Sequence, residues 1–116
     1  MRVKYHEIEG QEQVLVLADE TNGIGTPNLY TVEATNGAFC IGIPFQNGPI
    51  PTSGINGVTI ESLIAICKHR LEGFQSGPFP CRENAQAMVR LQEALDILKG
   101  RTLDRIQRQV EGKEKA

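Results

Sequence analysis

Apolar residues recur at every second position along two neighbouring segments in the first half of the chain, LYTVEA (29–34) and AFCIGIP (38–44). This period places the apolar residues on one face of a β-strand. Asn36 and Gly37 separate the two segments. Asn-Gly is a strong hairpin signal because both residues tolerate the positive φ of a type I′ turn. We therefore predict a β-hairpin over these segments.

Two segments further upstream also have strand character. VLVLA (14–18) predicts a third strand, and RVKYHEI (2–8) predicts a weaker fourth one. PFQNGPIPTSGING (44–57) is rich in proline and glycine, so we expect it to end the sheet and act as a linker. Three more Asn-Gly pairs mark turns, at 22–23, 47–48 and 56–57. The first half of the chain is thus expected to form a small antiparallel sheet.

After this linker the hydrophobic period changes to that of an amphipathic helix. Thr59 is suited to the N-cap and Glu61 to the first turn of this helix. One apolar seam follows at spacings of 4, 3, 4 and 3, formed by Ile60, Ile64, Cys67, Leu71 and Phe74. SGPFP (76–80) then breaks the helix, because proline and glycine disfavour its continuation.

A second helix is predicted to begin near Pro80 or Cys81. Its apolar seam consists of Met88, Leu91, Leu95 and Leu98. A further apolar set, out of phase with this seam, consists of Leu103, Ile106 and Val110. We therefore expect the helix to change its packing partner or to loosen near Gly100, and EGKEKA (111–116) to form a solvated tail.

These elements predict an α+β fold with two parts. Residues 1–55 would form the antiparallel sheet region with its Pro/Gly linker, and residues 56–116 a long antiparallel helical hairpin with a short tail. Two helices cannot enclose a core between themselves, and a sheet covers at most one side of a hairpin. The second apolar set needs another surface, so we predict a homo-oligomer.

Residues suited to enzyme chemistry are sparse. His6 and His69 are the only histidines, and neither has a metal-binding or catalytic spacing to another residue. The three cysteines show neither a disulfide framework nor a zinc motif. Cys67 on the apolar seam is most simply a core residue, and Cys81 lacks a partner histidine. We expect no catalytic residue, no metal and no cofactor.

Composition narrows the class of protein. A chain of 116 residues with 40% hydrophobic and 22% charged residues is typical of one globular domain. The first ten residues lack the apolar run of a signal peptide, and no segment approaches the roughly 20 apolar residues of a membrane span. We therefore expect a cytoplasmic protein without a membrane partner.

Positive charge gathers near the C-terminal end, although the formal net charge is −2. Arg101, Arg105 and Arg108 stand at i, i+4 and i+7, which stacks three guanidinium groups on one helix face. Like charges at this spacing cost a helix about 0.2–0.5 kcal/mol per pair. Such a face suits a small anion, but it also suits the helix dipole and solubility.

The predicted turn GFQSGPFPCRENA (73–85) combines aromatic rings with an amide. Phe74 and Phe79 crowd the connection, and Asn84 lies in the first turn of the second helix. A helix N-terminus with an amide side chain suits an anion or a base edge, although a core Phe74 and an exposed Asn84 explain the same pattern. The turn lies roughly 25 Å from the arginines at 1.5 Å per residue, so only two antiparallel protomers would bring both to one ligand.

NGVTIESLIAICKHRLEGFQSGPFPCRENAQAMVRLQEAL followed by RTLDRIQRQVEG, within residues 56–112, resembles the helical hairpin of two groups of phage anti-defence proteins. These groups are the Thoeris anti-defence sponges and the anti-CBASS sponges, and the added N-terminal sheet is similar to the Thoeris group. The resemblance implies a protein that is no enzyme and that sequesters cyclic ADP-ribose isomers of the glyco-cyclic type. Some members also hold cyclic di- or trinucleotides in separate pockets.

The resemblance also implies the site residues. The family's ligand-binding phenylalanine, asparagine and pair of arginines fall on Phe74, Asn84, Arg101 and Arg105. The aromatic ring would stack on adenine, and the arginines would hold the pyrophosphate. The resemblance further implies dimers that build a hexamer, and action in the cytoplasm of an infected bacterial host.

Two other classes of function fit the same residues. A small nucleic-acid-binding regulator would use the arginine face, but the acidic net charge and the lack of RNA-stacking motifs argue against a nucleic-acid partner. A structural phage assembly protein would use its arginines only for salt bridges between subunits.

Overall fold

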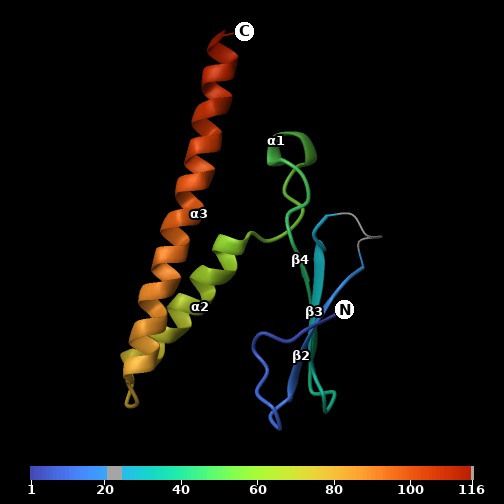
Figure 1. The fold of residues 1–116 in the computed structure, drawn as a ribbon, viewed down its shortest axis with the longest axis vertical. Helices are drawn as coiled ribbons and strands as arrows, with labels where there is room; N and C mark the ends of the chain where they lie inside the picture. Colours follow the sequence, from blue (N-terminus) through green and yellow to red (C-terminus); the bar gives the residue numbers. More distant parts are fainter. Residues whose placement is uncertain (21–24, 116) are drawn as a thin grey trace. The chain divides into compact units, whose positions relative to one another are not determined.

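In a computed structural model the chain forms a four-stranded sheet followed by helices, which confirms the predicted α+β class (Figure 1). The structure describes residues 1–20 and 25–115, and their side chains as far as Arg108. The predicted turn at 22–23 and the side chain of Val110 lie outside the described residues. The chain divides into two compact units, Met1–Thr59 and Ile60–Ala116.

The sheet is antiparallel throughout and follows the order of the sequence. Its strands are β1 (Arg2–Val3), β2 (Val14–Ala18), β3 (Leu29–Ala34) and β4 (Cys40–Pro44), in the order β1-β2-β3-β4. The strands predicted over 14–18 and 29–34 are confirmed residue for residue as β2 and β3. The strand expected over 38–44 begins two residues later, at Cys40, and the one expected over 2–8 ends at Val3.

The register of the strands gathers the alternating apolar residues on one face. Val32 lies opposite Val16 on β2 and Ile41 on β4, and Tyr30 lies opposite Ala18 and Ile43. Directly opposed residues share a face of the sheet. The Tyr30 ring also meets the ring of Phe45 edge to face, with centroids 5.3 Å apart. The alternation predicted from the sequence is therefore the basis of this face.

The turn between β3 and β4 differs from the predicted type I′ turn. The Gly37 N–H donates to the Ala34 carbonyl at 3.1 Å, which centres the turn on the two residues between them. Gly37 then takes a positive φ of 80°, and the Asn36 Oδ1 accepts the Ala38 N–H at 2.9 Å. The loop is longer than a two-residue Asn-Gly turn. The Asn36 side chain accepts a hydrogen bond from the backbone two residues on, and Gly37 supplies the positive φ that the chain reversal requires.

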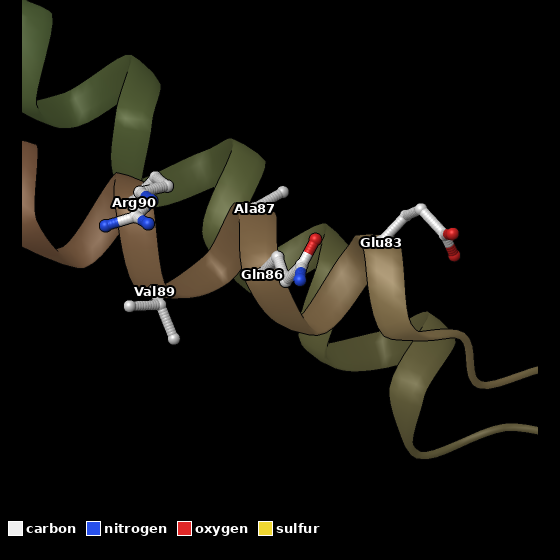
Figure 2. Close-up of a pocket in the computed structure, with 5 residues that line it drawn as sticks. All are labelled: Glu83, Gln86, Ala87, Val89 and Arg90. Carbon is white, nitrogen blue, oxygen red and sulfur yellow. The ribbon is translucent and has the colours of Figure 1, made fainter.

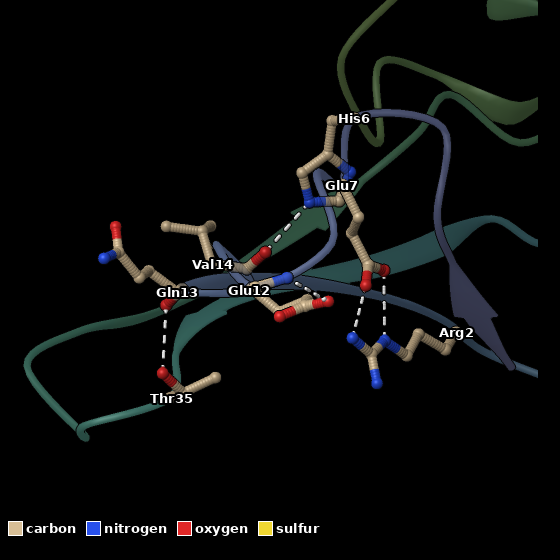
Figure 3. Close-up of polar contacts among 8 residues, drawn as sticks. Arg2, His6, Glu7, Glu12, Gln13, Val14 and Thr35 are labelled. Atoms are coloured by element: carbon tan, nitrogen blue, oxygen red, sulfur yellow. Dashed lines mark hydrogen bonds and ion pairs between the residues drawn. The ribbon is translucent and has the colours of Figure 1, made fainter.

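A set of local contacts explains why β1 ends early (Figure 3). The Glu7 N–H donates to the Lys4 carbonyl at 3.0 Å, which turns the chain away from the sheet. The Glu7 carboxylate pairs with the Arg2 guanidinium, and this pairing lowers the pKa of Glu7. A ring nitrogen of His6 lies 2.9 Å from the Val14 carbonyl oxygen. These polar contacts thus take the place of the backbone hydrogen bonds that a longer β1 would form with β2.

The sheet ends at Pro44, as predicted, and the Pro/Gly segment 44–57 that follows it is closed on itself. Phe45 and Val58 form a parallel bridge, in which the Gln46 N–H donates to the Val58 carbonyl and the Val58 N–H donates to the Pro44 carbonyl, both at 2.8 Å. The loop between these ends contains the short helix α1 (Ile50–Ser53).

Side-chain amides fill the base of this loop. The Gln46 Nε2 donates to the carbonyls of Gly54 and Gly48, at 2.8 and 3.1 Å. The Asn56 amide pairs with the backbone of Asn47, with bonds of 2.7 and 2.8 Å. These contacts hold the ends of the loop together without a hydrophobic core.

The helical unit consists of α2 (Ile60–Gln75) and α3 (Arg82–Lys115). Thr59 precedes the first residue of α2 and Glu61 lies in its first turn, as the sequence predicts. Helix α3 begins one residue after Cys81 and runs unbroken through Gly100. The helix therefore does not loosen at Gly100, and the backbone of 111–115 continues it instead of forming a separate tail. The alternative expectation, a change of packing partner near Gly100, stays a prediction.

The predicted seam of α3 is confirmed, since Met88, Leu91, Leu95 and Leu98 are all partly buried. The predicted seam of α2 is only partly correct. Ile64 and Leu71 are partly buried, but Ile60, Cys67 and Phe74 are exposed. The packed face of α2 is rotated towards Lys68, whose ammonium reaches the Glu72 carboxylate at 2.8 Å while its aliphatic stem covers apolar surface.

The described part of the chain buries very little apolar surface. Ala18, at 5% exposure, is its one buried apolar residue, and the other apolar residues described are partly buried or exposed. In the apolar set near the C-terminal end, which is expected to pack on another subunit, Leu103 is 65% and Ile106 is 50% exposed. Neither unit thus builds a closed core of its own from the described side chains.

Candidate functional site

The connection between α2 and α3 is closed by one glutamine side chain. The Gln75 Nε2 donates to the Cys81 carbonyl, and the Gln75 Oε1 accepts the Cys81 N–H, both at 2.9 Å. The Cys81 Sγ in turn accepts the N–H of Asn84 at 3.4 Å, which is the contact of an N-cap residue. These bonds fix where the last turn of α2 stands relative to the first turn of α3.

Two of the predicted site residues lie at this end of the hairpin. Phe74 is in the last turn of α2 and keeps 49% of its surface exposed. Asn84 is in the first turn of α3, is partly buried, and forms no side-chain hydrogen bond within the described part of the chain. Phe79, in the turn between them, is 82% exposed. An open aromatic ring and a free amide thus occur within one short connection.

Phe74 has a cation beside it. The Cζ of Arg70 lies 5.3 Å from the centroid of the Phe74 ring, and Arg70 is one helical turn earlier on α2. A guanidinium within about 6 Å of a ring face is attracted by the ring quadrupole. The sequence analysis did not identify Arg70 as a site residue. Its i,i+4 spacing to Phe74 would have indicated that the two side chains are neighbours on the helix surface.

The three arginines near the C-terminal end of α3, Arg101, Arg105 and Arg108, differ in their surroundings. Arg108 forms an ion pair with Asp104 at 2.9 Å. The Arg105 Nη2 lies 3.4 Å from the Thr102 hydroxyl, which is a weak contact. Among the side chains that the structure describes, no carboxylate pairs with Arg101 or Arg105, and both are exposed. These two guanidinium groups therefore remain available to an anion.

One chain does not bring the four predicted residues together. Asn84 and Arg101 belong to a single unbroken helix. A rise of 1.5 Å per residue separates them by about 25 Å. Phe74 and Asn84 thus form one end of a candidate site, and Arg101 and Arg105 form another, along the same helix.

A shallow hollow lies beside the first turns of α3 (Figure 2). Its volume is about 470 Å³, and it is lined by Glu83, Gln86, Ala87, Val89 and Arg90. Arg90 forms an ion pair with Glu93 at 3.1 Å, so its positive charge is already neutralised by a residue of the same helix. The hollow includes none of the four predicted residues, and nothing in the hydrophobic pattern had indicated it.

Within residues 1–20 and 25–108, no cluster of three or more metal-ligating side chains is present. In the described part of the chain, no helix combines the length and the apolar character that crossing a bilayer requires.

Two comparisons with known proteins concern this hairpin. Residues 41–96 match the Acb2/Tad1 hairpin domain, a region that contains Phe74 and Asn84 but ends before Arg101 and Arg105. The match begins before the segment 56–112 on which the resemblance was based, because it includes β4 and the closed loop.

A relative is also found among phage proteins. The chain is 51% identical over 70 residues to "Thoeris anti-defense 1" of Bacillus phage SBSphiJ7. The aligned region is 60% of this chain and 49% of that relative, so the chain spans about half the length of the relative it matches. The hairpin of this chain is thus similar to the Acb2/Tad1 hairpin domain and to part of a phage Thoeris anti-defence protein.

Proposed function

We propose that this protein is a phage anti-defence sponge, which binds cyclic ADP-ribose isomers made as immune signals and holds them without converting them. The observation that carries the proposal is the 51% identity to a Thoeris anti-defence protein over 70 residues. The exposed Phe74 ring supports it, as do Arg101 and Arg105, which pair with no carboxylate among the described side chains, because such a ligand offers a flat base and a pyrophosphate.

In this proposal each site is shared by two antiparallel protomers. Phe74 and Asn84 of one protomer meet the base, while Arg101 and Arg105 of the other protomer meet the pyrophosphate. The separation of about 25 Å along α3 makes this arrangement necessary for a ligand of small size. Two antiparallel copies of α3 would place the N-terminal end of one helix beside the arginine face of the other.

The chemistry of the four residues suits recognition rather than turnover. A base stacks on an aromatic ring, and an amide reads the edge of a base. Guanidinium groups bind phosphate oxygens through paired, charge-assisted hydrogen bonds. None of these contacts activates a nucleophile, so the bound signal should survive intact.

Native mass spectrometry with a panel of cyclic nucleotides tests the proposal. The panel contains glyco-cyclic ADP-ribose isomers and the cyclic di- and trinucleotides of CBASS signalling. We expect a complex with at least one cyclic ADP-ribose isomer. Binding of the cyclic oligonucleotides alone would replace the proposed ligand class, and binding of none would contradict a sponge.

Release of the ligand tests the absence of turnover. The complex is denatured and the supernatant is separated by chromatography. The cyclic isomer should be recovered unchanged, in an amount equal to that bound. Recovery of linear ADP-ribose would indicate an enzyme.

A further inference from the structure

Arg70 and Phe74 form a pair whose cation has no acidic residue three or four positions away on its own helix. On α2 the positions three and four residues from Arg70 carry no acid, being Ile66, Cys67, Gly73 and Phe74. The nearby Glu72 carboxylate is held by Lys68 at 2.8 Å, and that ammonium lowers the pKa of Glu72. Among the described ion pairs none includes Arg70, so its guanidinium interacts with the Phe74 ring.

The contact restricts an otherwise open side chain. Phe74 is 49% exposed, and a ring on the last turn of a helix would exchange between rotamers if nothing covered it. The backbone at this position is already fixed, because the next residue, Gln75, is bonded twice to Cys81. The remaining freedom is that of the Phe74 side chain itself, and Arg70 lies over its ring.

We infer that Arg70 is a positioning residue for base recognition: it covers one face of the Phe74 ring and leaves the opposite face to stack on a flat base. This inference rests on the proposed function, in which Phe74 receives the adenine of the signal. A ring that is ordered before binding loses less conformational entropy when the base arrives, which strengthens binding. Arg70 therefore acts through Phe74 and not through a contact with the ligand.

Three variants of the full chain separate this role from others. Arg70→Gln keeps a polar, hydrogen-bonding side chain but shortens it and removes the cation, whereas Arg70→Lys keeps the cation. Arg90→Gln is the matched control, because Arg90 is an exposed helical arginine already paired with Glu93. Glyco-cyclic ADP-ribose is the probe, and isothermal titration calorimetry measures its dissociation constant.

We expect Arg70→Gln to weaken binding about two- to fivefold, the range that an exposed cation–π contact supplies. Arg70→Lys should stay close to the parent, and Arg90→Gln should equal it. An Arg70→Lys variant as weak as Arg70→Gln would indicate a direct bidentate contact with the ligand and would overturn the positioning role. Equal binding by Arg70→Gln and the parent would overturn it as well.

Nuclear magnetic resonance provides a readout that does not depend on the ligand. In the free protein the Arg70 Nε–H resonance should be shifted upfield by the ring current of Phe74, and Phe74→Leu should abolish this shift. An unshifted resonance would overturn the inference even if Arg70→Gln binds weakly. A parent that binds no cyclic ADP-ribose isomer would instead overturn the proposed function, and the positioning role with it.

Discussion

At the scale of single residues, Arg105 allows the sharpest test of the candidate site. Each charge-assisted hydrogen bond contributes roughly 1.5–3 kcal/mol, so Arg105→Ala should weaken the binding of a cyclic ADP-ribose isomer by about ten- to a hundredfold. The helix should not suffer, because the substitution removes a repulsion from Arg101. Calorimetric titration and a thermal melt followed by circular dichroism measure the two effects.

Lys99→Ala is the control for this experiment, since Lys99 is an exposed cation of the same helix. It should change the affinity little. If Arg101→Ala and Arg105→Ala both bind as tightly as the parent, the arginines are not part of the site.

Phe74 illustrates what a hydrophobic pattern can and cannot predict about a site residue. Its spacing to Ile64 and Leu71 is helical, and the pattern therefore included it in the seam of α2. The structure leaves Phe74 half exposed while Ile64 and Leu71 pack. Period alone cannot tell which of two apolar stripes faces the neighbouring helix, because Lys68 contributes apolar surface to the packed face through its stem. The exposed ring is visible only once the rotation of the helix is known.

At the scale of elements, the closed loop after β4 depends on Gly57. A Cβ atom at this position would lie 2.6 Å from the carbonyl oxygens of both Phe45 and Pro44. Real side chains do not approach backbone this closely, so Gly57→Ala should push apart the bridge between Phe45 and Val58. We expect a loss of stability of about 1–3 kcal/mol, the usual effect of overpacking. Hydrogen exchange of the Val58 amide reports the opening of the bridge.

Gly73→Ala is the matched control, because a Cβ at Gly73 meets nothing within 4 Å. Replacing a glycine inside a helix should stabilise it by about 0.5–1 kcal/mol. Unchanged protection of the Val58 amide in Gly57→Ala would show that the loop tolerates the side chain by shifting elsewhere.

The loop between β1 and β2 should respond to acid through Glu7. The Arg2 guanidinium, by its hydrogen bond and its charge, holds the pKa of Glu7 below the ordinary value of 4.5. A depressed pKa stabilises the fold above the unfolded-state pKa, and this stability is lost as the pH falls through the folded value. Titration of the Glu7 carboxyl carbon by nuclear magnetic resonance should therefore give a midpoint below 4.5.

Arg2→Gln should return the midpoint of Glu7 towards its ordinary value. A parent midpoint at or above 4.5 would mean that the ion pair does not persist in solution.

The elements themselves were largely predictable, and the connections were not. The strand over 29–34 follows from alternation, the strand over 14–18 follows from its short apolar run, and the seam of α3 follows from its period. The closed loop at 44–58 depends on side-chain amides that bond to backbone groups distant in sequence, such as Asn56 on Asn47. Proline and glycine content predicts a chain reversal there, but it carries no information about which amide meets which carbonyl.

At the scale of the whole molecule, the exposed apolar residues predict assembly. In the described part of the chain only Ala18 is buried among the apolar residues, and a stable protein covers more of its apolar surface than this. Light scattering at micromolar concentration should therefore give a dimer or a hexamer. Leu103→Glu combined with Ile106→Glu should shift the mass downwards, because both side chains are at least half exposed in the single chain. A monomeric parent would remove the basis for a shared site.

A mixing experiment tests the shared site itself. Phe74→Ala and Arg105→Ala proteins are each expected to bind poorly. A mixed dimer combines the intact Phe74 of one chain with the intact Arg105 of the other, so one of its two sites is restored. Random pairing of equal amounts makes about half of the dimers mixed, so calorimetry on refolded mixtures should recover about a quarter of the tight sites. No recovery would show that Phe74 and Arg105 do not complete one site across two protomers.

The unbroken course of α3 between Asn84 and Arg101 also has an evolutionary consequence. An unbroken helix fixes the distance and the angle between two of its residues. One inserted or deleted residue therefore rotates all later residues of the helix by about 100° and shifts them by about 1.5 Å along the axis. Arg101 and Arg105 would then point away from the partner's aromatic end, although every side chain of the site was still present. If the shared site is correct, relatives that keep the same ligand should differ from this chain between 84 and 101 by substitutions and not by changes in length.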